Sequence, residues 1–376
     1  MRRRYQTRST RPIRTAAPIP SSLLAIVSSA QSFSRLKHGA RRLVGRGPGG
    51  QGYEPSTAGP NGKSAEAIEP AGFELVPKGH LEPFSTAEYD VLPRGLYDTV
   101  PRNYYSPIPD VSLLPVDIWR RRSDLCGVAL DPAAGIEFLE HELSPFIAEL
   151  DVEVQDPGRP GVFFLHNSGF ESVDAEILYG MIRSARPRRV LELGSGYSTL
   201  LINMAVRRNA EEGKPTEHLV YDPYPREQVL GTEMPEPTRL ETVSATDVPL
   251  SFFTQLDAGD VLFVDTTHTV KLGSDVNFIV LEVLPRLKAG VLVHFHDIFL
   301  PWEYPRLWFE KLQYYWAEQY LLQAFLAFND AFEVLLPAHA ISRVYPERLA
   351  RIVPSYEFGV MPGSLWLRSI ARRSTT

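Results

Sequence analysis

One stretch near the middle of the chain constrains the fold more than any other. A short apolar run, a glycine-rich turn and an amphipathic segment follow one another over residues 189–200. The apolar run predicts a buried strand at 189–193, and the residues after the turn predict a helix at 197–208. Gly194 and Gly196 lie between them and let backbone approach a ligand closely. Strand, glycine turn and helix in this order are typical of the ligand-binding crevice of an open α/β sheet.

The turn differs from the fingerprint of proteins that bind dinucleotides. The third glycine of that fingerprint would fall at Thr199, and Glu192 lies just before the turn. An acidic residue at this place suits a ligand that carries a cation better than one that carries phosphates. A nucleotide-dependent oxidoreductase is therefore kept only as the alternative.

Strand and helix patterns alternate through the rest of the chain, which predicts a parallel sheet with right-handed crossovers. After the first strand and helix, the predicted elements are 218–222, 240–244, 249–256, 260–265, 274–287 and 290–296. A short strand at 162–165 and a helix at 174–183 precede them. A long helix at about 303–328 follows, and then two last strands at 332–335 and 364–367, one of them antiparallel.

Basic and acidic residues are distributed unevenly along the chain of 376 residues. Residues 1–53 carry eleven Lys or Arg and no acid, which leaves 28 basic against 45 acidic residues in the remainder, a formal charge of −17. An acidic body is a poor electrostatic partner for nucleic acid. The single cysteine, Cys126, excludes an internal disulfide and a zinc–thiolate cluster. The sequence has no apolar stretch long enough to cross a membrane.

Three regions follow from these patterns. Residues 1–70 are basic and rich in Pro, Gly and Ser, which predicts a disordered tail and linker. Residues 71–155 predict an N-terminal cap that is first extended and then helical, with a helix from Asp131 to about Leu150. Residues 156–370 predict the main domain. We expect a cytoplasmic protein; the basic tail leaves an organellar transit segment or peripheral membrane contact as alternatives.

Four stretches together resemble the class I S-adenosylmethionine-dependent methyltransferases. They are the glycine turn at 189–200 and the three strand patterns His218–Asp222, Gly259–Asp265 and Gly290–Asp297. The stretch from Thr266 to Pro305 resembles a branch of small-molecule O-methyltransferases. The resemblance covers about residues 100–370. It implies a Rossmann-like α/β fold with a mostly parallel seven-stranded sheet, helices on both faces and an N-terminal extension.

The resemblance also implies that S-adenosylmethionine is the cofactor and lies against the glycine turn. The residues expected to bind it are Glu192, Gly194, Ser195, Gly196, Tyr197, Asp222 and Asp247. Asp222 ends the second strand, where the family holds the ribose hydroxyls, and Asp247 is the candidate for the adenine. The alternative for Glu192 and Asp222 is a structural role in capping strand ends.

A metal site is predicted where two strands end. Asp265 ends one strand and His296-Asp297 ends the next, and the carboxyl ends of neighbouring parallel strands converge on the crevice. Asp265, His296 and Asp297 therefore predict a divalent metal site. In the metal-dependent relatives these positions hold carboxylates and an amide, and the imidazole of His296 favours a softer ion than magnesium. The alternative is that these groups only hydrogen-bond neighbouring backbone.

A general base is predicted at His268. Its unperturbed pKa of about 6.5 suits proton transfer at neutral pH, and the resemblance places the family's base at this position. Asp265 and Asp297 complete the predicted catalytic set, and Asp275 is expected to orient the imidazole. The alternative is that His268 is a structural residue before the helix at 274–287. His294 shares a strand face with His296, and we expect a hydrogen-bonded core residue there.

These predictions favour a methyltransferase that acts on a hydroxyl of a small molecule, such as a sugar or natural product. An oxidoreductase and a cofactor-binding scaffold without catalysis are the alternatives. Trp302 and Tyr304 are candidate pocket walls, and Tyr104 and Tyr105 are candidates for a lid. The oligomeric state is not predicted.

Overall fold

The computed structural model describes residues 106–371, except 233 and 358, together with two short segments at 73–77 and 97–101. The chain divides into two units, Met1–Ser106 and Pro107–Thr376. In the first unit, β1 (Phe73–Pro77) and β2 (Tyr97–Pro101) pair antiparallel. The predicted tail at 1–70 and the proposed lid residues Tyr104 and Tyr105 lie outside the described residues.

The second unit is built on a seven-stranded sheet with the order β5-β4-β3-β6-β7-β9-β8. β9 runs antiparallel to both of its neighbours, and the other pairs are parallel. The strands are β3 (Arg189–Leu193), β4 (Glu217–Tyr221), β5 (Thr238–Glu241), β6 (Val261–Val264), β7 (Leu292–Phe295), β8 (Phe332–Pro337) and β9 (Leu365–Ser369). The predicted mostly parallel seven-stranded sheet, with one of its last strands antiparallel, is confirmed.

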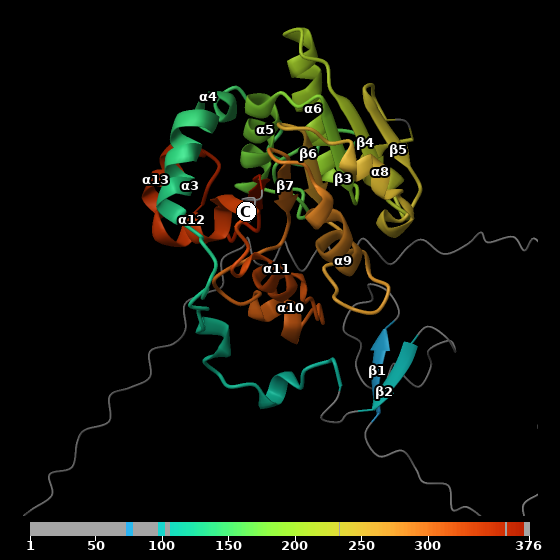
Figure 1. Cartoon of the computed structure of the whole chain (residues 1–376), viewed down its shortest axis with the longest axis vertical. Coiled ribbons are helices and arrows are strands. Elements are labelled where there is room, and N and C mark those ends of the chain that lie inside the picture. The colour runs from blue at the N-terminus through green and yellow to red at the C-terminus, as the bar shows by residue number, and fades with distance from the viewer. Residues whose placement is uncertain (1–72, 78–96, 102–105, 233, 358, 372–376) are drawn as a thin grey trace, which may run out of the picture. The chain divides into compact units, whose positions relative to one another are not determined.

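Helices cover both faces of this sheet and the edge at which its parallel strands end. They are α3 (Pro132–Phe138), α4 (Ser144–Ile147), α5 (Asp174–Ala185), α6 (Tyr197–Glu211), α7 (Glu227–Leu230), α8 (Leu250–Thr254), α9 (Asp275–Phe278), α10 (Arg306–Glu310), α11 (Glu318–Leu326), α12 (Ala338–Val344) and α13 (Pro346–Ile352). Figure 1 places α9, α10 and α11 below the sheet, where β6 and β7 end. A functional site at these carboxyl ends is therefore enclosed by residues from the later part of the chain.

The core follows from the two-residue period of the strands. On β3, Val190 joins a cluster that includes residues of α5 and α6, whereas Leu191 joins a second cluster that includes residues of α8 and α11. On β6, Phe263 and Leu262 divide in the same way. Strands buried on both faces are expected to be apolar almost throughout, as these are.

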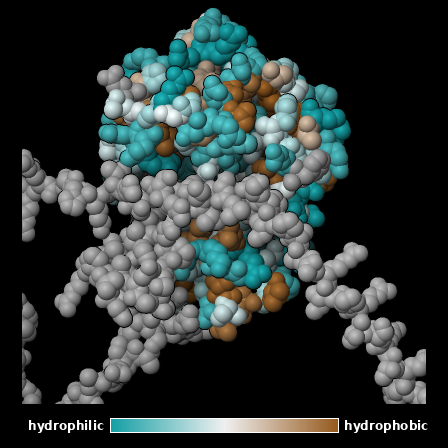
Figure 2. Space-filling model, turned by 180° about the vertical axis from the view of Figure 1, so that it is seen from behind, coloured by the Kyte–Doolittle hydropathy of each residue, from teal (hydrophilic) through white to brown (hydrophobic). Residues whose placement is uncertain are grey.

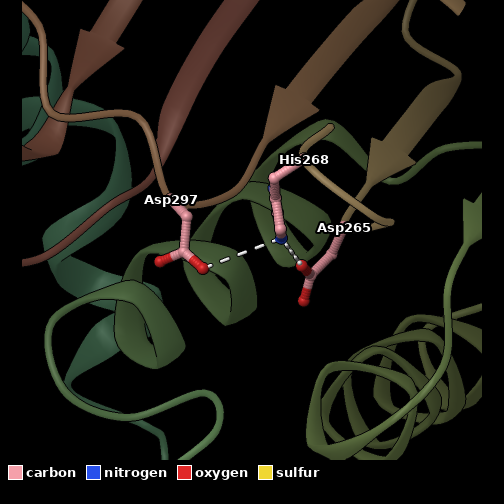
Figure 3. Close-up of side chains that lie close together, drawn as sticks. All are labelled: Asp265, His268 and Asp297. Carbon is pink, nitrogen blue, oxygen red and sulfur yellow. Dashed lines mark ion pairs between the residues drawn. The ribbon is translucent and has the colours of Figure 1, made fainter. Parts of the chain in front are cut away.

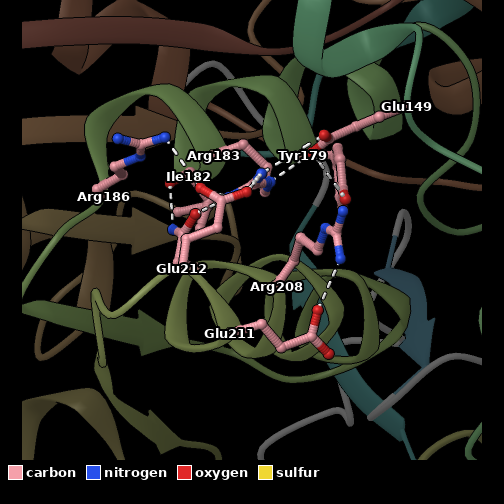
Figure 4. Close-up of polar contacts among 9 residues, drawn as sticks. Glu149, Tyr179, Ile182, Arg183, Arg186, Arg208, Glu211 and Glu212 are labelled. Atoms are coloured by element: carbon pink, nitrogen blue, oxygen red, sulfur yellow. Dashed lines mark hydrogen bonds and ion pairs between the residues drawn. The ribbon is translucent and has the colours of Figure 1, made fainter.

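A buried arginine joins the helices before the sheet to the main body. Arg183 of α5 is only 1% exposed; it pairs with Glu149 and Glu212 and donates a hydrogen bond to Asn209 of α6 (Figure 4). A buried guanidinium needs such partners, because an unpaired buried charge is strongly destabilising. The network ties the end of the segment at 132–150 to two helices of the sheet.

Three predicted elements differ from the structure. Residues 162–165 form no strand; Phe164 makes only an isolated bridge with Glu153. The strand predicted at 240–244 lies at 238–241. The long helix predicted at 303–328 is two helices, because Gln313 has a left-handed φ of 55° and the backbone N–H groups of Ala317 and Glu318 bond to the carbonyl of His268 instead of continuing a helix.

The surface gives two further observations. A cavity of about 630 Å³ lies at the amino-terminal ends of β3, β4 and β5, where Arg188, Thr216 and Arg239 contribute to its lining, so it is at the opposite end of these strands from the predicted site. Figure 2 shows the back of the molecule, where hydrophilic and hydrophobic residues are interspersed.

None of the helices within the described ranges is long and apolar enough to span a bilayer.

Candidate functional site

The glycine turn and Asp265 meet at the carboxyl ends of β3 and β6. These strands are parallel neighbours, and the backbone N–H of Asp265 donates to the carbonyl of Leu193 at 3.0 Å. Gly194 has a φ of +85°, and a Cβ there would lie 1.8 Å from the carbonyl oxygen of Asp265. Only glycine fits this contact. The turn predicted to bind the cofactor and the residue predicted to act in chemistry are therefore in direct contact.

Asp222 closes the other side of the glycine turn. Its Oδ2 accepts from the backbone N–H of Ser195 at 2.9 Å and from the Ser195 hydroxyl, and its Oδ1 accepts from the N–H of Tyr224 at 2.7 Å. A carboxylate has about four acceptor positions, so Asp222 retains room for about one further donor. It is half-buried at the end of β4.

Glu192 has contacts that favour the structural alternative. The side chain is fully buried; it accepts from the hydroxyls of Ser198 at 2.7 Å and Thr199 at 2.9 Å and pairs with His218 at 2.8 Å. Each carboxylate oxygen has a partner inside the protein, between the sheet and α6. These contacts support the structural alternative, and cofactor binding by Glu192 stays a prediction.

The other predicted cofactor residues lie around the same end of the sheet. Gly196 is the residue before α6, and a Cβ there would meet only a nitrogen of Arg226, at 3.2 Å. Tyr197 is half-buried and packs edge-on against Phe164. Asp247 is exposed, in the 3₁₀ turn Ala245–Asp247 that follows β5.

Three predicted catalytic side chains converge beyond β6 and β7 (Figure 3). The Nε2 atom of His268 lies 3.2 Å from Oδ1 of Asp265 and 3.7 Å from Oδ2 of Asp297. One potential ligand atom from each of the three residues lies within 4.8 Å of the other two. The His268 side chain is only 4% exposed, whereas those of Asp265 and Asp297 are 29% and 18% exposed. The group is open to ligands from the side of the carboxylates.

Two of these three residues have an unusual backbone conformation. His268 has a φ of 55° and Asp297 a φ of 58°, in the left-handed region that costs a non-glycine residue free energy. Contacts from elsewhere hold Asp297 in place: Gly363 packs against its Cα, and the carbonyl of Gly363 accepts from the N–H of Ile298 at 2.8 Å. The buried Asp174, in turn, accepts from the N–H groups of Gly363 and Ser364, each at 2.8 Å.

A residue that the sequence analysis missed holds the imidazole. Oε2 of Glu318 lies 2.8 Å from Nδ1 of His268, and the Glu318 side chain is 1% exposed. Asp275, which was predicted to orient this ring, instead accepts hydrogen bonds from the backbone and hydroxyl of Thr267. That prediction was wrong, because the first turn of the nearby helix faces the loop before His268. Glu318 comes 50 residues later, and no local motif marks it.

The structure brings a different trio together from the predicted metal set. His268, rather than His296, lies between the two aspartates, while Nε2 of His296 lies 3.7 Å from Oδ1 of Asp297 alone. The ring of Phe170 packs on His296 at 4.7 Å. His294 is a buried core residue, as expected, with Nε2 3.0 Å from the Ser364 hydroxyl.

The charges of this site are coupled. Burial lowers the pKa of His268, but its hydrogen bonds to Asp265 and Glu318 outweigh this and raise the pKa well above its usual value. Burial raises the pKa of Asp265, but the nearby His296 and His268 lower it to about 2. Burial raises the pKa of Asp297, and the two imidazoles oppose this. The contacts of His268 with Asp265 and Glu318 thus favour its charged form, and the two imidazoles favour the ionised form of Asp265.

Aromatic rings border the cluster, but the predicted wall residues are not its nearest neighbours. Tyr304 is 2% exposed and belongs to the core, and Trp302 packs against His339. The ring of Trp316 instead packs on His268 at 4.2 Å, and Tyr314 stacks on Trp316 at 4.8 Å. The break between α10 and α11 carries these two rings.

Comparison with known proteins gives one family match and one relative. A family model described as a methyltransferase domain matches residues 191–298, which include the glycine turn, Asp222, Asp265, His268 and Asp297. An uncharacterized protein of Archaeoglobus fulgidus is 29% identical over 144 residues. The match covers 37% of this chain and 64% of that protein, so the chain spans less than two thirds of the relative's length.

The solved structures found in the comparison have low sequence identity to this chain and low TM-scores. CmcI in a complex with Mg and S-adenosylmethionine has a TM-score of 0.33 and 16% identity, over 60% of this chain and 83% of that one. The plantazolicin methyltransferase BpumL in complex with S-adenosylhomocysteine has a TM-score of 0.32 and 11% identity, over 64% of this chain and 99% of that one.

Proposed function

We propose that this chain, a member of the class I S-adenosylmethionine-dependent methyltransferase family, transfers a methyl group from S-adenosylmethionine to a hydroxyl of a small molecule. One observation carries the proposal: Gly194 of the cofactor turn touches the backbone of Asp265, which belongs to the cluster of titratable side chains. Donor and acceptor sites are thereby adjacent, as an in-line displacement requires.

The cofactor end of the proposed site consists of Gly194, Ser195, Gly196 and Asp222. A Cβ at Gly196 would meet only the Arg226 guanidinium, at 3.2 Å, and Asp222 has an acceptor position left for a ribose hydroxyl. Asp247 remains the proposed contact for the adenine. The residues present therefore fit a nucleoside, because Asp222 offers a carboxylate to a ribose and the turn offers backbone groups.

The acceptor end consists of Asp265, His268 and Asp297. Methyl transfer to a hydroxyl requires that its proton leave, and a divalent cation bound here would lower the pKa of the acceptor hydroxyl. Asp265 and Asp297 supply oxygen ligands that fit such an ion. His268, which the sequence predicts as the base, has its Nε2 3.2 Å from Asp265, and its carboxylate neighbours raise its pKa. These contacts favour His268 as a partner of the neighbouring carboxylates over His268 as the base.

The acceptor itself is proposed only as a class. A sugar or natural-product hydroxyl fits a partly open group of carboxylates, and the acidic charge of residues 54–376 disfavours nucleic acid. We propose a cytoplasmic enzyme, with a tail at 1–70, a cap at 71–155 and a catalytic domain at 156–370.

Cofactor binding tests the proposal directly. Asp222→Ala is expected to weaken the binding of S-adenosylhomocysteine by about 1–3 kcal/mol, which is about 5–150-fold, because a charge-assisted hydrogen bond to the ribose is lost. Gly196→Val is expected to abolish binding, because the new side chain would separate a ligand from the backbone of the turn and crowd Arg226. Isothermal titration calorimetry measures both.

Gly213→Ala is the matched control, because a Cβ at Gly213 meets nothing within 4 Å and the residue lies at the far end of α6. Its affinity should equal that of the wild type. Wild-type protein that binds reduced nicotinamide dinucleotide in place of S-adenosylhomocysteine would identify the oxidoreductase alternative and end this proposal.

A further inference from the structure

We propose that His268 is a ligand of a divalent cation, together with Asp265 and Asp297, and that Glu318 is the positioning residue that fixes the imidazole for this task. The inference rests on the proposed function in placing the cation in the acceptor site. It goes further in replacing the predicted base with a nitrogen ligand and in naming the class of metal.

One separation between these side chains falls within the range of a metal site, and the others exceed it by an amount that side-chain rotation can close. Two ligand atoms bound side by side to one ion, each about 2.1 Å from it, lie roughly 3.0–3.5 Å apart. Nε2 of His268 lies 3.2 Å from Oδ1 of Asp265 and 3.7 Å from Oδ2 of Asp297. Small rotations of two partly exposed carboxylates would complete the set, while the buried imidazole stays in place.

Contacts on the far side of the imidazole fix its orientation. Nδ1 lies 2.8 Å from the buried carboxylate of Glu318, which leaves Nε2 facing Asp265 and Asp297. The backbone N–H groups of Ala317 and Glu318 donate to the carbonyl of His268 at 3.0 and 3.2 Å, and Trp316 packs on the ring. Metal-binding histidines generally donate their second ring N–H to a carboxylate or carbonyl, which sets the tautomer and the ring orientation.

Two carboxylates and one imidazole nitrogen face the same point. A divalent ion held there would meet oxygen ligands from two aspartates and a nitrogen ligand from His268. Glu318 supplies a third carboxylate next to the same imidazole, so the group carries three carboxylates around one ring. Carboxylates grouped around an imidazole in this way are ligands and supporting groups of the kind that divalent cations use.

The donor set selects among divalent ions. Magnesium prefers oxygen ligands alone, whereas manganese, iron, cobalt and zinc accept an imidazole nitrogen beside carboxylates. The site should therefore bind Mn²⁺ more tightly than Mg²⁺.

The experiment titrates the full-length chain with Mn²⁺ and with Mg²⁺ by calorimetry and records the pulsed electron paramagnetic resonance spectrum of the Mn²⁺ complex. We expect tighter binding of Mn²⁺ and a nitrogen coupling from one imidazole. Glu318→Gln should lower the Mn²⁺ affinity by about 10–100-fold. Asp275→Asn is the matched control: it removes a nearby carboxylate that bonds Thr267 rather than His268, so it should leave the affinity within about threefold.

The spectrum of the wild-type complex needs no variant, so misfolding of Glu318→Gln leaves the test intact. Bound Mn²⁺ without nitrogen coupling, or no Mn²⁺ binding at all, overturns the inference, as does an unchanged affinity in a folded Glu318→Gln protein. Binding of S-adenosylhomocysteine in the absence of metal is measured in parallel. If the Mn²⁺ test fails and S-adenosylhomocysteine still binds, only this inference is overturned. If S-adenosylhomocysteine does not bind either, the proposed function is overturned as well.

Discussion

Gly194→Ala is expected to destabilise the protein by more than about 4 kcal/mol, an unusually large effect for adding one methyl group. The new Cβ would lie 1.8 Å from the carbonyl oxygen of Asp265, so the end of β3 or of β6 must move. The φ of +85° adds about 1–2 kcal/mol of strain for any side chain. Thermal unfolding measures the effect, and we expect a fall in Tm of roughly 10 °C or more.

Gly213→Ala separates the two causes. Gly213 has a φ of +78°, close to that of Gly194, but its Cβ position has no neighbour within 4 Å. This variant should show only the cost of the left-handed backbone, about 1–2 kcal/mol. Equal falls in Tm for the two variants would mean that the contact between the turn and Asp265 relaxes easily. The contact would then no longer support the proposed function.

The second large effect concerns turnover. His268→Ala and Asp265→Asn are each expected to slow methyl transfer by about 10²–10⁴-fold, because each removes part of the group that lowers the pKa of the acceptor hydroxyl or takes its proton. Binding of S-adenosylhomocysteine should be unchanged in both. The measurement is a single-turnover rate with an acceptor found by screening sugars and phenols, and Asp275→Asn is the control.

Chelation assigns the cause of that loss. If a chelator slows the wild type as much as His268→Ala does, the imidazole acts with a cation. If the chelator has no effect and His268→Ala is inactive, His268 is the base predicted from the sequence. If the His268→Ala protein is fully active, His268 has only a structural role.

Local patterns predicted the framework well. The strand at 189–193, the glycine turn and the two later strands were found because buried parallel strands are almost continuously apolar and Gly194 must adopt a positive φ. Asp265, His268 and Asp297 could be placed together because parallel strands end at one edge. These features depend on a few neighbouring residues, which a sequence displays directly.

The errors arose where distant contacts decide. Asp275 was favoured as the partner of His268 because it is near in sequence, but Glu318 reaches the ring from α11. Glu192 was predicted as a ligand because it precedes the glycines, and the sequence did not show that His218 and α6 bury it. The helix predicted at 303–328 breaks because the N–H groups of Ala317 and Glu318 bond to His268. In each case a tertiary contact outweighs the local preference.

The hydrogen bonds from Gly363 and Ser364 to Asp174 have a consequence for protein engineering. They fix the start of β9, and Gly363 in turn supports the strained backbone of Asp297. The segment that matches the family, 191–298, therefore receives its geometry from residues on both sides of it. A chimera that transplants this segment alone would carry every proposed ligand except Glu318, and it would also lack the scaffold that holds Asp297 at its φ of 58°. The smallest transferable module extends from α5 through β9.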